Sequence, residues 1–261
     1  MRIKRLIFLK HVHNLRTLGG LKTIDGRRIR EGILLRSAEL SKVKEREMRI
    51  LKERYGLKTV IDLRTLGEVE KHPDVTLEGI QYLYLPVCRE QIPGVSREAE
   101  PGSKSTTADM LPDLRDTYRL LITDPETMGN FKPILETILR NRDGAILWHC
   151  TAGKDRCGMV AVMLESLLGA DAETIRRDYL LTNLDSGFDA CKYAFLIRVF
   201  KRDKAFARKV FLAYAAKTAY LNAALDRIRE EYGRIEDYLV KGVGIDPEDI
   251  RAFREYALTK M

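Results

Sequence analysis

Residues 145–159 read AILWHCTAGKDRCGM. The apolar residues 145–148 open the stretch, and a second apolar run covers 159–168. The short run is typical of a buried strand, and the longer run is typical of a helix. The segment between them therefore predicts a tight loop that joins a strand to the N-terminus of a helix. Cys150 stands at the start of this loop, and Arg156 follows six residues later.

The predicted loop has the chemistry of a phosphate site. Backbone N–H groups at a helix N-terminus bind anions, and Gly153 permits backbone conformations that other residues avoid. The guanidinium of Arg156 can hold two phosphate oxygens at once. The same positive field lowers the pKa of a thiol from about 8.5, so Cys150 can ionise and attack phosphorus. We expect a cysteine-dependent phosphatase that forms a phosphocysteine intermediate and needs no metal or other cofactor.

Composition places the chain among ordinary globular proteins. Of its 261 residues, 45% are apolar and 32% are charged. The net charge of +8 comes from Lys and Arg that are interleaved with Asp and Glu, and no nucleic-acid recognition module is visible. A basic surface attracts phosphorylated substrates in general. We expect a phosphorylated partner and no dedicated nucleic-acid binding, and the sequence leaves the oligomeric state open.

Cysteine usage and the apolar runs predict a cytoplasmic protein. The cysteines show neither a paired framework nor metal-ligand spacing, which is typical of a reducing compartment. They are Cys88, Cys150, Cys157 and Cys191. The apolar run 6–9 is too short for a signal peptide, and no run reaches the length of an integral membrane segment. Secretion by a route without a cleaved signal is the alternative.

The N-terminal half predicts an α/β sheet. Strands are expected over 32–36, 59–61, 80–87 and 145–149. Ser41 is expected to cap a helix over 42–54. Helical patterns between several strands indicate a parallel or mixed sheet that helices cover. The segment 89–111 is rich in Pro, Gly, Ser and Thr, and it predicts a long loop that is either a substrate lid or a surface insertion.

The C-terminal part, 171–261, is predicted to be helical. Helices are expected over 172–182, 189–200, 203–216, 218–232 and 247–258. Asp171 and Asp246 are expected to cap the first and the last of them. No linker composition separates this part from the sheet region, so we expect a single domain over 1–261.

The loop sequence His-Cys-x-x-Gly-Lys-Asp-Arg-x-Gly resembles the signature of bacterial tyrosine phosphatases of the atypical, lipid-phosphatase-like type. Further blocks that resemble this family lie at 14–20, 32–38, 60–65 with Glu68, 73–74, 179–183 and 232–239. The resemblance thus covers nearly the whole chain. It implies the protein-tyrosine-phosphatase fold, a central and mainly parallel sheet with helices on both sides. It also implies dual- or triple-specificity activity, on phosphotyrosine, on phosphoserine or phosphothreonine, and in several members on phosphoinositides.

The resemblance also assigns roles within the loop. Cys150 is expected to be the nucleophile and Arg156 the phosphate clamp, with Lys154 adding positive charge at the rim. The expected phosphate-binding residues are Thr151, Ala152, Gly153, Lys154 and Cys157. The expected supporting residues are His149, which would orient the loop, Asp62 and Arg64.

The general acid is the least determined part of the predicted site. Asp155 leads, because some members of the family are thought to use this loop aspartate. The alternative to an acid role is a structural one, in which the Asp155 carboxylate orients the loop or pairs with Arg36 or Arg64. The two arginines could reach the phosphate pocket themselves, but salt bridges with Asp62 or Glu39 explain them at least as well. The remaining candidates are Asp62 and the acids around the long loop, Glu90, Asp109, Asp113 and Asp116.

Cys157 departs from the family pattern. The family usually has Thr or Ser after the arginine, where the hydroxyl hydrogen-bonds to the thiolate. A thiol is a poorer donor, so we expect slower hydrolysis of the intermediate. A reversible disulfide between Cys157 and Cys150 is a second interpretation. The sequence favours a third, in which Cys157 is a small residue that packs at the start of the helix.

Four functions follow from these motifs. The first is a protein phosphatase that favours phosphotyrosine and also accepts phosphoserine or phosphothreonine. The second is a phosphoinositide or inositol-phosphate phosphatase. The third is a catalytically weak phosphate-binding module. A sulfur-transfer protein is the most remote, since such loops lack the Gly-Lys-Asp-Arg ending.

Overall fold

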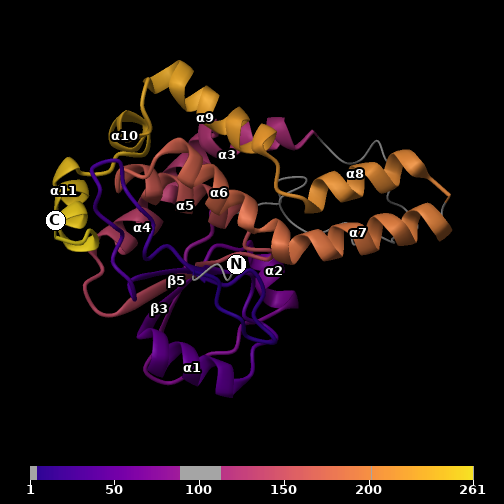
Figure 1. Cartoon of the computed structure of the whole chain (residues 1–261), viewed down its shortest axis with the longest axis horizontal. Helices are drawn as coiled ribbons and strands as arrows, with labels where there is room; N and C mark the ends of the chain where they lie inside the picture. The colour runs from indigo at the N-terminus through magenta and orange to yellow at the C-terminus, as the bar shows by residue number, and fades with distance from the viewer. Residues whose placement is uncertain (1–4, 89–112, 201, 261) are drawn as a thin grey trace.

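The computed structural model describes residues 5–88, 113–200 and 202–260. Its strands are β1 Arg16–Thr17, β2 Leu34–Ser37, β3 Leu57–Asp62, β4 Gln81–Tyr84 and β5 Ala145–His149. Within the described residues they form one sheet in the order β1-β2-β5-β3-β4. In Figure 1, the labelled strands β3 and β5 lie between α1 and α4. β2, β5, β3 and β4 run parallel, and β1 pairs with β2 in the antiparallel sense. The predicted loop over 89–111, with its candidate acids, lies outside the described residues.

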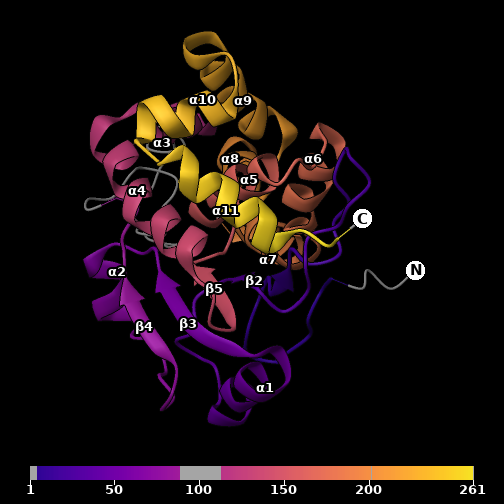
Figure 2. The same cartoon turned by 90° about the vertical axis from the view of Figure 1, so that its left-hand side faces the viewer.

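Helices cover both faces of this sheet (Figure 2). They are α1 Glu45–Tyr55, α2 Leu66–Lys71, α3 Leu114–Thr123, α4 Pro125–Arg140, α5 Asp155–Leu167, α6 Ala172–Leu181, α7 Asn183–Phe200, α8 Lys204–Tyr214, α9 Thr218–Tyr232, α10 Ile235–Asp237 and α11 Pro247–Ala257, with a π-helix over Tyr238–Val243. Among the described helices, none is both long enough and apolar enough to cross a bilayer.

Two hydrophobic cores lie on the two faces of the sheet, because successive side chains of a strand point to opposite sides. Val60 and Leu147 join the core that includes Met48 of α1. Ile146 and Trp148 join the larger core, to which α3, α4, α5, α9 and α11 contribute. In Figure 2, α1 lies below the sheet, and α4, α5 and α11 lie above it. β5, the strand that leads into the loop, is therefore buried on both faces in the middle of the fold.

The strand predictions are confirmed with shifted ends. β5 has its expected bounds, whereas β2 starts only at Leu34, since Gly32 turns the chain with φ +74°. β3 is longer than expected, and β4 is confined to Gln81–Tyr84. β1 is a strand that the sequence does not predict, because two residues are too few to show an alternating pattern. The mainly parallel, helix-covered sheet expected from the family resemblance is confirmed.

The cap predicted at Ser41 is wrong, and the caps of two later helices are confirmed. α1 begins after Lys44, whose backbone N–H donates a hydrogen bond to the Glu47 carboxylate at 3.0 Å. Glu47, at the third position of the helix, thus bonds back to the N-cap residue, as the acid of a capping box does. Asp171 and Asp246 cap α6 and α11 as expected.

Several helices were missing from the sequence prediction or differ from it. α7 begins at Asn183 rather than at residue 189, since Ser186 and Gly187 have low helix propensity and hide its start. The sequence does not predict α2, α3 or α4. These helices matter for the site, because α2 and α3 each place a side chain against the loop.

Candidate functional site

The loop after β5 lies at the carboxyl edge of the parallel strands, where open α/β sheets bind ligands. Cys150 follows the strand directly, and α5 begins at Asp155. Gly153 has φ +66°, and a Cβ atom there would lie 2.5 Å from the carbonyl oxygen of Ser37. Glycine is therefore required, both by the backbone conformation and by the close approach of β2.

Side chains from outside the loop hold two of its carbonyl groups in place by hydrogen bonds. The Asn14 amide donates to the carbonyl oxygens of Ala152 and Gly153 at 3.0 and 2.9 Å. Arg36 Nη2 donates to the Gly153 carbonyl at 2.7 Å. The N–H of a trans peptide points away from its C=O, so these bonds turn the amides of Gly153 and Lys154 toward the opposite side. The arrangement provides a set of N–H donors for an anion.

Cys150 carries an ionised sulfur at neutral pH. Its side chain is buried, and burial opposes ionisation. Hydrogen bonding to Cys157 and the positive charge of Arg156 outweigh burial and lower the pKa of Cys150 to about 5. A cysteine with a lowered pKa is more reactive than an ordinary buried cysteine.

Cys157 lies behind the loop. Its thiol is fully buried, and its sulfur lies 3.7 and 3.9 Å from the carbonyl oxygens of Ser37 and Trp148. Burial and the neighbouring Cys150 sulfur hold its pKa well above the ordinary value, so the proton stays on Cys157. The residue therefore acts on the Cys150 sulfur from inside the fold, and it also packs at the start of α5.

Arg156 is held in place by a carboxylate from α2. Its Nη1 and Nη2 donate to the two oxygens of Glu68 at 2.6 and 2.8 Å. Burial opposes the charge of Glu68, but the hydrogen bonds and ion pair with Arg156 lower its pKa to about 2. Arg156 Nε is buried and has no hydrogen-bond partner within the described part of the chain. The guanidinium of Arg156 is thus fixed by Glu68 through Nη1 and Nη2, and its Nε–H can donate to a phosphate oxygen.

Asp155 is buried in a cluster of tyrosines. The Tyr118 hydroxyl, from α3, donates to Asp155 Oδ1 at 2.5 Å and also contacts the Tyr179 hydroxyl at 2.6 Å. Lys154 Nζ lies 3.4 Å from the same carboxylate oxygen. Lys154 is 2% exposed, so its expected place at the rim is wrong. The expected alternative pairing of Asp155 with Arg36 or Arg64 does not occur, since both guanidiniums engage other carboxylates.

His149 belongs to a buried ionic cluster below the loop. Its Nε2 lies 2.8 Å from Asp74 Oδ2, and Asp62 lies on its other side. Arg64 Nη2 contacts Asp62 and Asp74 at 2.7 and 2.9 Å. Burial disfavours a charged imidazole, but the two carboxylates outweigh burial and raise the pKa of His149.

The same cluster offers the most ligand-like group of side chains within the described ranges. Asp62, Asp74 and His149 each present a ligand atom within 4.8 Å of the others. The guanidinium of Arg64 already contacts both carboxylates. An added cation would have to displace Arg64, so the cluster fits an internal ion-pair network better than a metal site.

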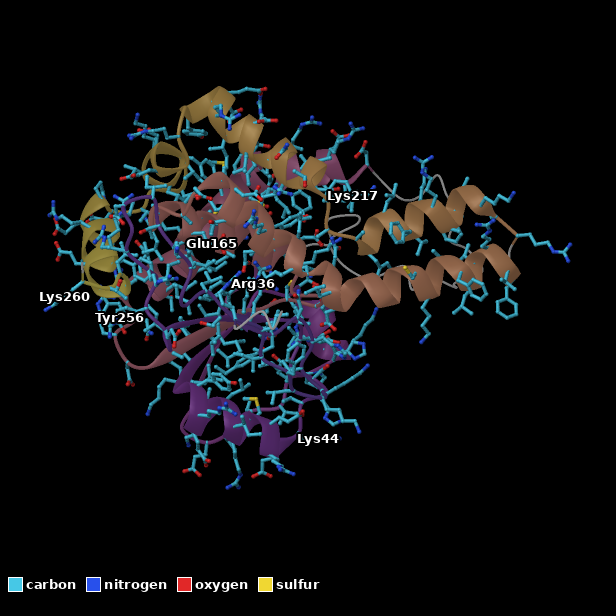
Figure 3. All side chains as sticks on the ribbon, viewed as in Figure 1. Arg36, Lys44, Glu165, Lys217, Tyr256 and Lys260 are labelled. Carbon is cyan, nitrogen blue, oxygen red and sulfur yellow. The ribbon has the colours of Figure 1, made fainter. Side chains whose placement is uncertain are left out.

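A second buried network supports the loop from the side of β2 (Figure 3). Asp178 of α6 pairs with Arg5, Arg16 and Arg36 at 2.5, 3.2 and 3.4 Å. Burial opposes its charge, but the three guanidiniums lower the pKa of Asp178 well below the usual range. Burial and the charge of Asp178 raise the pKa of Glu165. Figure 3 shows Arg36 and Glu165 in the interior of the body.

Replacing Asp178 with asparagine is expected to destabilise the fold. The change leaves Arg16 and Arg36 buried without their carboxylate, and breaking such a group costs about 3–5 kcal/mol. Chemical denaturation of Asp178→Asn measures the free energy of unfolding. Asp226→Asn, at an exposed ion pair with Arg229, is the matched control and should change it by less than about 0.5 kcal/mol. Equal free energies for the two variants would contradict the role of the network.

The structure brings together the core of the predicted site. Cys150, the loop residues and Arg156 meet at the start of α5, and Asp62, Arg64 and His149 lie below them. Of the candidate acids around the long loop, the two that the structure describes do not join them: Asp113 caps α3, and Asp116 pairs with Arg119 at the surface. The sequence reasoning missed the contributions of Glu68, Asn14, Asp74, Asp178 and Tyr118.

For three of these residues, the sequence does contain an indication of a role. Asn14, Glu68 and Asp74 stand inside the blocks that resemble the phosphatase family, although that resemblance gave them no role. Tyr118 and Asp178 reach the site from helices far along the chain, and no local pattern marks them. The arrangement as a whole can bind a phosphate dianion and transfer its phosphoryl group to sulfur.

Comparison with known proteins gives the family. A model of the tyrosine phosphatase family matches residues 7–259. A provisionally named tyrosine-protein phosphatase of Cupriavidus necator is 27% identical over 258 residues, covering 92% of this chain and 85% of that protein. The triple specificity protein phosphatase PtpB of Mycobacterium tuberculosis is 26% identical over 255 residues, covering 87% of this chain and 91% of that protein. The crystal structure of P. aeruginosa TpbA in complex with pTyr aligns with a TM-score of 0.28 at 15% identity, over 77% of this chain and 89% of that chain.

Proposed function

This chain belongs to the tyrosine phosphatase family of phosphoric monoester hydrolases, and we propose that Cys150 is the nucleophile of a reaction through a phosphocysteine intermediate. The observation that carries the proposal is the place of Cys150, directly after β5 and at the start of a loop that offers amide donors and Arg156 to an anion. The lowered pKa of Cys150, about 5, supports it. Thr151, Ala152, Gly153 and Lys154 contribute the loop backbone that holds the phosphate.

The first half of the reaction moves the phosphoryl group to sulfur. The loop amides and Arg156 Nε hold the non-bridging oxygens, so that Cys150 Sγ lies in line with the leaving oxygen. The S–P bond forms as the P–O bond to the leaving group breaks. Fixed donors stabilise the charge that spreads over the three oxygens, and this costs no reorganisation at the moment of reaction.

In the second half, water attacks phosphorus and sulfur leaves as a thiolate. The Cys157 thiol keeps its proton and hydrogen-bonds to the Cys150 sulfur, which stabilises the leaving thiolate. A thiol is a weaker donor than a hydroxyl, so we propose that breakdown of the phosphocysteine limits turnover.

Asp155 is our proposed general acid for the first half. Tyr118 and Lys154 contact Oδ1 and fix the orientation of the carboxyl group. We propose that the other carboxylate oxygen, Oδ2, delivers the proton to the leaving oxygen. The acids that flank the long loop offer weaker support, because Asp113 and Asp116 each pair with a surface arginine.

Asp155→Asn is expected to slow alkyl phosphates more than activated aryl phosphates. An alkoxide is a poor leaving group, so losing the acid should cost about 10²–10⁴-fold with an alkyl ester and far less with a nitrophenyl ester. Steady-state kinetics with the two esters gives both ratios. Asp116→Asn, on the surface of α3, should leave both rates unchanged. An equal loss with the two esters would assign Asp155 a structural role.

We propose phosphotyrosine as the preferred substrate, with phosphoserine and phosphothreonine also accepted. The family and the names of the two relatives support this choice. A phosphotyrosine peptide, a phosphoserine peptide and a soluble phosphoinositide should be compared by kcat/KM. The phosphotyrosine peptide should give the highest value. A higher value for the phosphoinositide would replace this proposal with a lipid phosphatase, and binding without turnover of all three would indicate a phosphate-binding module.

A further inference from the structure

The helices α7 and α8 form a hairpin that extends from the body of the molecule (Figure 1). The hairpin has a small core of its own, in which Ile197 of α7 packs with Phe206 and Val210 of α8. Its base is closed by Asn183, whose side-chain amide accepts from the N–H of Ala216 at 2.7 Å and donates to its C=O at 2.8 Å. The hairpin is thus a defined element that the proposed chemistry does not use.

The outer part of α7 leaves an apolar stripe uncovered. Phe195, Leu196, Val199 and Phe200 are 65%, 37%, 48% and 80% exposed. Spacings of one and four residues place them on one side of the helix, whereas the buried Ile197 faces α8. Contiguous exposed apolar surface of this kind marks an interaction site, whereas single exposed apolar residues are common.

The same segment carries an excess of positive charge. Residues 191–211 hold seven Lys and Arg residues and one acid, Asp203. Arg198, Arg202 and Arg208 are exposed, on α7, at the turn and on α8 respectively. The cations and the apolar stripe therefore share the outer part of the hairpin, where Figure 3 shows side chains that project away from the body.

We propose that the α7–α8 hairpin binds the surface of an anionic lipid bilayer. The headgroups of such a surface attract Lys and Arg, and the acyl boundary beneath accepts Phe and Leu side chains. A second copy of this chain matches the hairpin less well, because pairing the stripes would bring the cations of two hairpins together. Binding requires no turnover, so it stands or fails independently of the proposed reaction.

Sedimentation with lipid vesicles tests the proposal with the full chain. We expect binding to vesicles of equimolar phosphatidylcholine and phosphatidylglycerol, little binding to phosphatidylcholine alone, and a decrease with added salt. Phe195→Ser with Phe200→Ser, and separately Arg198→Glu with Arg202→Glu and Arg208→Glu, should each weaken the binding at least about tenfold. Turnover of a soluble aryl phosphate should stay unchanged in both, which shows that the variants fold.

Matched controls place the same changes on the body. Phe8→Ser with Ile24→Ser removes two equally exposed apolar side chains, and Arg229→Glu with Arg234→Glu and Arg251→Glu makes the same change of charge. Both controls should bind like the unmodified chain. The proposal is overturned if that chain ignores anionic vesicles, if neutral vesicles bind equally, or if controls and hairpin variants lose binding alike. A dimer that depends on Phe195 and Phe200 in ultracentrifugation would also overturn it, in favour of a second copy.

Discussion

Cys150→Ser is expected to abolish turnover of every phosphate ester, by at least about 10⁴-fold. The Cys150 thiol, with its pKa lowered to about 5, is ionised at neutral pH. A serine hydroxyl in the same place stays protonated, because the pKa of an alcohol lies far above that of a thiol, and it is a weak nucleophile in that form. Phosphate binding should survive, since Arg156 and the loop amides are unchanged. The measurement is kcat together with the dissociation constant of inorganic phosphate.

Cys191→Ser is the matched control for this change. Cys191 is exposed on α7, so its replacement should leave kcat within a factor of about two. Turnover that persists in Cys150→Ser at even a tenth of the original rate would show that the phosphoryl group does not pass through this sulfur. Loss of phosphate binding in the variant would indicate a collapsed loop, and the experiment would then measure structure rather than chemistry.

Arg156→Lys is expected to lower kcat/KM by about 10³–10⁵-fold, the scale of an arginine that stabilises a transferring phosphoryl group. The positive charge is kept, but the planar fork is lost. Lysine cannot bind both oxygens of Glu68 and also present a second edge to the phosphate. The Cys150 thiolate should also become less stable, because part of its charge compensation comes from Arg156.

The control for Arg156 is Arg229→Lys, at an exposed ion pair with Asp226, and its kinetics should be unchanged. Thermal melting of both variants separates catalysis from folding, since Glu68 is buried and loses its bidentate partner in Arg156→Lys. A loss of less than about tenfold in kcat/KM, the scale of one modest interaction, would show that Arg156 is a structural partner of Glu68 rather than the phosphate clamp.

Sequence patterns predict the fold well where the pattern lies within the strand or helix that it marks. The run 145–149 is apolar and short, and it is the central strand β5 in the structure. Asp171 and Asp246 mark helix starts because a cap acts within its own turn. Ser41 is not a cap, because α1 begins only after Lys44. The Glu47 carboxylate accepts a hydrogen bond from the backbone N–H of Lys44 there.

The loop could be predicted from sequence, and the residues that hold it could not. Cys150, Gly153 and Arg156 form one contiguous motif. Asp178, by contrast, is brought to Arg36 by the packing of α6 against the sheet, and Tyr118 is brought to Asp155 by α3. Such contacts depend on tertiary structure, and a single sequence contains no periodic signal for them.

Lys154 shows that the position of a side chain within the motif also depends on tertiary structure. A lysine in a phosphate loop predicts charge at the rim, but this side chain is buried beside Asp155. Its tertiary neighbours determine where it points. The single domain, the substrate lid or surface insertion over 89–111 and the cytoplasmic location stay predictions from the sequence.

Trapping the intermediate tests the central claim most directly. The protein should be mixed with an excess of a nitrophenyl phosphate, quenched in acid within the first turnovers and digested for mass spectrometry. Because the weak Cys157 donor slows breakdown of the intermediate, we expect one phosphoryl group on the peptide that contains Cys150. A burst of nitrophenol with the phosphoryl group on any other side chain, or with no phosphorylated peptide, would contradict the account.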